Sequence, residues 1–150
     1  MKLRNSRGSN LSETGPALFI FFLGILFPMI DLLSIAFIYA TCWYINFTVA
    51  NQAARARESE RDTIVTGVQK QIYNTGFASF LKIKDGDIKT DVNYPAVEAG
   101  LPAVLQCTTT VTGKPLVTLP AGGIIPAVPG LSAPVTFSIS TEMTRESTLK

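Results

Sequence analysis

Two carboxylates stand out because of where they lie in the chain. Glu13 begins a long apolar stretch, and Asp31 is the only formal charge between Glu13 and Arg55. An ionisable side chain in an apolar helix is costly unless it faces water, another helix or an opposite charge. The chemistry that these two positions predict is therefore pairing with a partner rather than proton transfer.

Asp31 allows two interpretations. It marks a subunit–subunit or anchor–partner contact, or it lies near the outer membrane interface because the span is shifted toward the N-terminus. Pro28, three residues earlier, would leave the carbonyl of Gly24 without its usual hydrogen-bond donor and is expected to kink the helix.

Catalysis and metal binding are not indicated. Histidine is absent, which removes the commonest general base and zinc ligand. No spacing pairs a Ser, Thr or Lys nucleophile with a base. Asp85, Asp87 and Asp91 lack the ligand pattern of a calcium-binding hand and predict a turn instead. We therefore expect no enzyme, no cofactor and no metal.

The two cysteines and the net charge point to no further partner. Cys42 lies in the apolar stretch and Cys107 in a strand-like segment, so we expect different environments, no disulfide and a filler role. The net charge of +2 is too small to indicate a nucleic-acid partner.

The apolar stretch predicts one membrane-spanning helix. About 20 apolar residues suffice to cross a bilayer, and we place the span at 17–40. Tyr39, Trp43 and Tyr44 resemble an interfacial aromatic cluster. The run is too long for a cleavable secretory signal. Because the leader 1–8 carries only basic charges, the positive-inside rule favours a cytoplasmic N-terminus and a single pass.

Helical periodicity continues beyond the span. Ile64, Val68 and Ile72 lie four residues apart, and Asn74-Thr75-Gly76 is a plausible stop. The pattern predicts a long N-terminal helix over 9–76, with an exported amphipathic part over 44–74. One continuous rod from 17 to 74 would measure roughly 85 Å.

The remaining residues, 77–150, predict a small β-containing head. Lys84 to Asp87 forms a strong turn signal. Alternating residues predict strands at 105–111 and 135–143, which we expect to pair antiparallel and pack on the helix. The apolar loop between them packs on its own domain or serves as a docking surface. The expected fold class is α+β.

The start of the helix resembles the prepilin-peptidase site of type IV pilins, which is a class III signal. A basic leader ends at Arg7-Gly8, and the acid Glu13 follows five residues later. Further residues are similar to those of TadE-like minor pilins of Tad-type systems, namely Gly24, Pro28, Asp31 and Asn51-Gln52-Ala53-Ala54-Arg55-Ala56-Arg57. The match covers roughly residues 7 to 60.

This resemblance implies a processing site and an assembly role. Cleavage would fall between Gly8 and Ser9, which makes Glu13 the fifth residue of the mature chain. The freed α-amino group of a neighbouring subunit would pair with that acid, and Asp31 would be a second subunit-assembly position. The implied partners are a prepilin peptidase, other pilin subunits, an inner-membrane assembly platform and membrane lipid.

Two functions follow from these observations. The first is a non-enzymatic minor pilin or pilin-like factor that assembles a Tad or type IV-like pilus or a related secretion system. It would lie in the bacterial inner membrane, with or without later incorporation into an extracellular pilus. The alternative is an uncleaved single-span binding module whose head recognises an envelope component.

Overall fold

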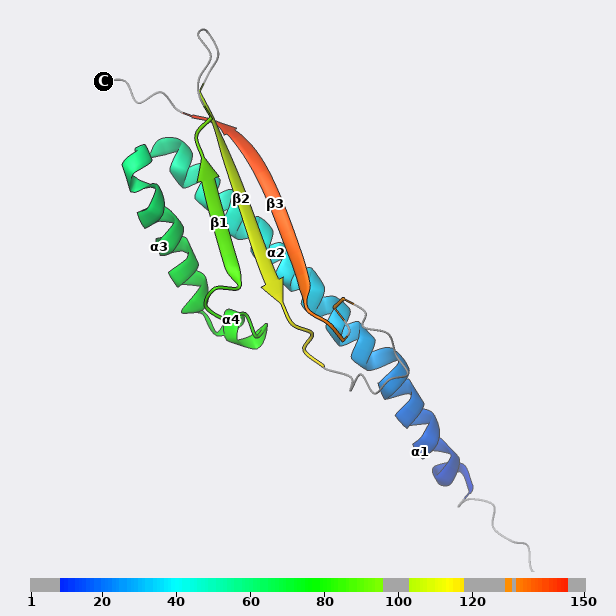
Figure 1. The fold of residues 1–150 in the computed structure, drawn as a ribbon. Coiled ribbons are helices and arrows are strands. Elements are labelled where there is room, and N and C mark those ends of the chain that lie inside the picture. The colour runs from blue at the N-terminus through cyan, green and yellow to red at the C-terminus, as the bar shows by residue number, and fades with distance from the viewer. Residues whose placement is uncertain (1–8, 96–102, 118–128, 131, 146–150) are drawn as a thin grey trace, which may run out of the picture.

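A long helix runs from the N-terminal end of the chain into a small head in the computed structural model (Figure 1). The structure describes residues 9–95, 103–117, 129–130 and 132–145, with side chains from Thr14 onward. The helix consists of α1 (Ser9–Phe21), the π-helical turn η2 (Phe22–Leu26) and α2 (Phe27–Arg55). The expected long apolar N-terminal helix is therefore confirmed.

The predicted single helix over 9–76 is wrong beyond Arg55. Ala56 and Arg57 adopt extended backbone, with ψ angles of 169° and 150°. A short 3-10 turn, η3 (Glu58–Glu60), follows, and α3 (Arg61–Tyr73) runs back beside α2 (Figure 1). The expected rod therefore does not form, and the amphipathic part at 44–74 is divided between α2 and α3.

The reason for this reversal is the loss of apolar residues at the turn. The buried face of α2 ends at Ala53 and Ala54, and apart from Ala56 the residues from Arg55 to Glu60 are polar or charged. Apolar residues return only in α3, where Val68 is buried in the same core as α2. Folding back buries this second apolar face, which a straight rod would leave in water.

The head is a three-stranded antiparallel sheet. After the short helix α4 (Gly76–Phe80) come β1 (Ile88–Asn93), β2 (Val104–Gly113) and β3 (Val135–Thr144), in the spatial order β1-β2-β3. The α+β fold with antiparallel strands is thus confirmed, and the two predicted strands are neighbours. The first strand was not predicted, because β1 offers only Ile88 and Val92 to the core.

The predicted helix end at Asn74 and the predicted turn from Lys84 to Asp87 are also confirmed. α3 ends at Tyr73 with Asn74 as its C-cap. In the turn, the Asp87 carboxylate accepts a hydrogen bond of 2.8 Å from the Lys84 N–H, and Gly86 has a φ of 92°. A positive φ of this kind favours glycine because it lacks a Cβ atom.

One face of the sheet packs on α2 (Figure 1). In β2 the alternate residues are buried as predicted, namely Leu105, Cys107, Thr109 and Val111. The facing residues of α2 include Ile38, Cys42, Ile45, Val49 and Ala53. Full burial of each large apolar side chain contributes about 1.5–3 kcal/mol, so this layer holds the head on the helix.

The cysteines are both buried and free, as expected. The expectation of different environments is wrong, because Cys42 and Cys107 belong to one core cluster between α2 and the sheet. The central part of the apolar loop, 118–128, lies outside the described residues.

Candidate functional site

The N-terminal part of the long helix projects beyond the head (Figure 1). Its large apolar side chains are exposed around the whole helix; Phe19 is 65 % exposed and Ile25 51 % exposed. The stretch from Thr14 to Arg55 forms a single helix, which is long enough and apolar enough to cross a membrane. Only an apolar environment or other apolar surfaces would cover such a segment favourably.

A π-helical turn precedes Pro28 within this segment. The N–H of Phe27 donates to the carbonyl of Phe22, five residues back, while Phe21, Leu26 and Phe27 keep helical dihedral angles. A proline in a helix removes one donor and crowds the carbonyl four residues earlier. The wider turn accommodates that conflict locally, and π turns of this type are common at functional positions.

Asp31 lies where the projecting helix meets the head. The side chain is 0 % exposed, and its Oδ1 atom accepts a hydrogen bond of 2.9 Å from the backbone N–H of Val117. Its Oδ2 atom and the Oγ atom of Ser34, one turn further on, are buried and have no hydrogen-bond partner among the described residues. The junction therefore combines one specific polar contact with two polar atoms whose burial is costly.

The structure describes only some of the site residues that the sequence predicted. Gly8 lies outside the described residues, Ser9 is the first residue of α1, and the side chain of Glu13 is not described. Glu13 and Asp31 lie on one helix and are separated by roughly 27 Å at 1.5 Å per residue. They therefore cannot form one site within a single chain. Asp31 faces the chain's own head.

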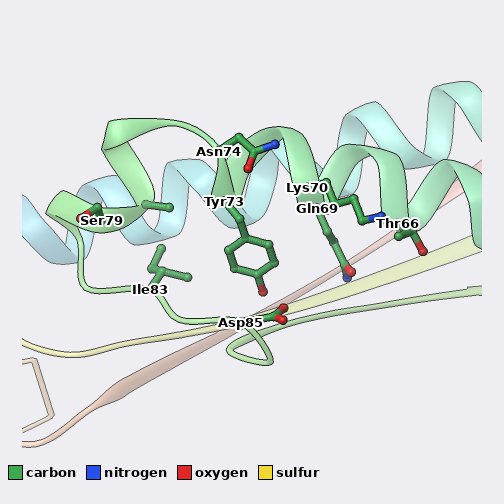
Figure 2. Close-up of a pocket in the computed structure, with 9 residues that line it drawn as sticks. Thr66, Gln69, Lys70, Tyr73, Asn74, Ser79, Ile83 and Asp85 are labelled. Atoms are coloured by element: carbon green, nitrogen blue, oxygen red, sulfur yellow. The ribbon is translucent and has the colours of Figure 1, made fainter.

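The head also carries a polar groove that sequence reasoning missed (Figure 2). It has a volume of about 600 Å³ and is formed by α3, α4 and the turn before β1. Its lining includes Thr66, Gln69, Lys70, Tyr73, Asn74, Ser79, Ile83 and Asp85. These residues lie within one stretch, from Thr66 to Asp85, and the packing of α4 and the following turn against α3 brings them together.

Tyr73 is the central side chain of this groove. Its ring points from α3 toward the turn that carries Asp85 (Figure 2). Its hydroxyl oxygen accepts a hydrogen bond of 3.4 Å from the N–H of Ile88, and burial raises the pKa of the hydroxyl. Tyr73 therefore stays neutral at physiological pH, and the groove suits a polar ligand rather than acid–base chemistry.

The cysteines do not form a reactive centre. The Cys42 thiol donates to the carbonyl of Thr109 at 3.3 Å. Burial raises the pKa of the Cys107 thiol to about 11, so this residue is a neutral thiol at physiological pH and a poor nucleophile. Within the described ranges, no group of three His, Cys, Asp or Glu residues is placed to hold a metal ion.

No protein-family profile, no curated protein and no solved structure matches this chain.

Proposed function

We propose that this protein is a non-enzymatic minor pilin or pilin-like factor in the assembly of a Tad or type IV-like pilus or a related secretion system. The observation that supports the proposal best is the division of one apolar helix into two parts. The N-terminal part exposes its large apolar side chains from Leu18 to Ile25, and the C-terminal part packs against the sheet of a small antiparallel head. A subunit that moves from a bilayer into a helix bundle needs this division.

The length of the bare part fits a bilayer better than the span expected from the sequence. Among the described side chains, Asp31 is the first along the helix that is fully buried, and it lies inside the expected span of 17–40. The segment from Ser9 to Ile30 measures roughly 33 Å at 1.5 Å per residue, close to the hydrocarbon thickness of about 30 Å. We therefore place the membrane segment at 9–30, which puts Asp31 at the outer interface.

The proposed assembly chemistry uses the N-terminal carboxylate. Cleavage between Gly8 and Ser9 by a prepilin peptidase frees an α-amino group. That group on a neighbouring pilin subunit pairs with Glu13 and offsets the cost of a carboxylate in lipid. Asp31 belongs to the junction with the head, where it sets how far the helix can enter the membrane or a bundle.

Processing of the leader tests this proposal. The full chain is produced in membranes with an active prepilin peptidase, and its intact mass and N-terminal sequence are determined. We expect the chain to begin at Ser9, and we expect Gly8→Ala to block cleavage. Gly24→Ala is the matched control, because an added Cβ there has no neighbour within 4 Å. Retention of Met1, or normal cleavage of Gly8→Ala, contradicts the proposal.

The polar groove supports a second candidate, an uncleaved single-span module that binds an envelope component. Lys70 and Asp85 supply charges of both signs, and Tyr73 offers a ring face, so a sugar-containing polymer is a suitable ligand. Sedimentation of the full chain with purified peptidoglycan tests this candidate. Binding that Tyr73→Ala abolishes, together with an intact Met1, favours the module over the pilin.

A further inference from the structure

The two edge strands of the sheet, β1 and β3, have different surroundings. α3 lies beside β1, whereas β3 lies on the opposite side of the sheet (Figure 1). Side chains of α3 bond to the outer backbone groups of β1. Tyr73 accepts from the Ile88 N–H at 3.4 Å, Gln69 donates to the Ile88 carbonyl at 3.4 Å, and Arg61 donates to the Val92 carbonyl at 3.2 Å. The β1 edge is therefore closed.

The same bonds establish which backbone groups of β3 point outward. Ile88 faces α3, so its partner Val111 directs its own N–H and carbonyl toward Phe137 of β3. At the end of the ladder, the N–H of Arg145 donates to the carbonyl of Ala103 at 2.8 Å. Odd-numbered residues of β3 thus bond to β2, and the even-numbered residues direct their backbone groups away from the sheet.

Among the residues that the structure describes, none gives β3 the usual protection of an exposed edge. It has ten residues, contains no Pro, Gly, Lys or Arg, and has Glu142 as its single charge. Natural proteins protect long edges with prolines, lysines, bulges or a covering element, because an unprotected edge pairs readily with another strand. Three cross-strand hydroxyl pairs, among them Thr110 and Ser138 at 3.2 Å, hold β3 in register on β2.

Aromatic residues of α2 form a shelf next to this edge. Tyr39 contacts the ring of Phe137 at a centroid distance of 5.5 Å, which places the shelf beside β3. Trp43 lies one turn further and stacks on Phe47 at 5.2 Å. Tyr39 and Trp43 are 50 % and 52 % exposed. A fourth strand on β3 would cover these rings with its own inward-facing side chains.

A second copy of this chain does not fit the edge. Antiparallel pairing of two β3 strands would point the two membrane helices in opposite directions. Pairing of β3 with β1 of another copy is blocked by α3. Parallel pairing of two β3 strands would turn the polar residues of one copy, such as Ser138 and Ser140, toward the aromatic shelf of the other. Pairing between the described strands of two copies is therefore unfavourable, and a strand of a different protein fits the edge better.

We propose that the β3 edge binds an extended segment of another protein, which adds to the sheet as a fourth, antiparallel strand. The segment alternates apolar residues, which face Tyr39 and Trp43, with polar residues, which continue the hydroxyl-rich outer face. Main-chain hydrogen bonds supply the affinity, and the aromatic shelf favours segments in which apolar and polar residues alternate. This inference does not depend on cleavage at Gly8.

A peptide of known sequence tests the edge. The probe is a fluorescein-labelled peptide of about ten residues in which valine and threonine alternate, with lysines at both ends. Its binding to the full chain in lipid nanodiscs is followed by fluorescence anisotropy. We expect binding, and we expect the backbone amides of Ser138 and Ser140 to become protected from hydrogen exchange. The Ile139 amide, which faces β2, should be protected with and without peptide.

Backbone changes on each side provide matched controls. Ser140→Pro removes one outward N–H without breaking a bond to β2 and should weaken binding at least about tenfold. Ser140→Ala keeps the N–H and should bind like the native chain. On the peptide, N-methylation of the threonines should abolish binding, because in an antiparallel pair their N–H groups face β3. N-methylation of the valines should be tolerated.

Three results would overturn the proposal. The first is equal binding of the threonine-methylated peptide, a test that does not depend on how any protein variant folds. The second is the absence of binding by the native chain. The third is self-association of the native chain through β3, seen by sedimentation and lost in Ser140→Pro, which would make a second copy the occupant.

Discussion

The long helix has two regions of similar apolar composition in different surroundings. From Leu18 to Ile25 its large apolar side chains are exposed on all sides, as at Leu18 and Ile20. After Asp31 one face is buried under the sheet, as at Ile38 and Ile45. The buried face also includes polar residues. Asn46, for example, donates to the Thr141 hydroxyl at 2.6 Å.

The difference between the two regions lies in how their residues are arranged around the helix. In the bare region no face is distinguished, which suits a lipid environment where every direction is equivalent. In the covered region small and polar residues share the sheet-facing side with Ile and Val, so the sheet can approach closely. Total apolarity is therefore a poor guide to where a membrane segment ends, and the first specific contact with the head is a better one.

The largest difference in the free energy of unfolding is expected when one isoleucine in each region is replaced by alanine. Ile45 is fully buried, so Ile45→Ala should lower the free energy of unfolding of the head by about 2–5 kcal/mol. Ile25→Ala, in the bare region, should change it by less than about 0.5 kcal/mol. Urea unfolding of the full chain in micelles, followed by circular dichroism, measures both. Equal losses of stability in the two variants would contradict the conclusion that only the second region packs against the head.

Matched glycine substitutions should give a smaller effect. A Cβ atom on Gly113 would overlap the side chain of Ile38, so Gly113→Ala should cost about 1–3 kcal/mol. Gly24→Ala meets no neighbour within 4 Å and should be neutral or slightly stabilising. Thermal unfolding of both variants tests the pair. Adding Ile38→Val to Gly113→Ala should restore part of the loss, and no restoration would argue against a steric origin.

The smallest effect is expected at the boundary itself. Asp31→Ala leaves the N–H of Val117 without its acceptor and should cost about 1–2 kcal/mol, mostly as local opening. Asp31→Asn keeps an acceptor oxygen and should cost less than about 1 kcal/mol. Hydrogen exchange of the Val117 amide measures the opening directly. Unchanged protection of that amide in Asp31→Ala would show that the carboxylate does not hold the head to the helix.

Several parts of the fold could be predicted from local patterns. The alternation in β2 and β3 predicted both strands and their inward faces, because side chains alternate between the two sides of a strand. The turn at Lys84 and the helix end at Asn74 followed from residue types that favour those conformations. The processing site at Gly8 and the assembly role of Glu13 stay predictions, because Gly8 lies outside the described residues and the side chain of Glu13 is not described.

Other parts could not be predicted because they depend on contacts between distant segments. The break after Arg55 contains neither Gly nor Pro, and it exists because α3 gains a buried face by folding back. Strand β1 has too few apolar residues to be recognised alone and is defined by its pairing with β2 and by bonds from α3. The polar groove depends on how α3, α4 and the turn before β1 pack on one another.

By itself the sequence determined an apolar N-terminal helix with one internal carboxylate and a small β head, since hydrophobic periodicity and turn chemistry are local properties. Only the tertiary structure decided where the bare helix ends, what Asp31 faces and which sheet edge stays open. These depend on the packing of segments that are far apart in the sequence, such as Asp31 and Val117, which are separated by 86 residues. A local sequence pattern does not show which distant segments will contact each other, because burial depends on the whole fold.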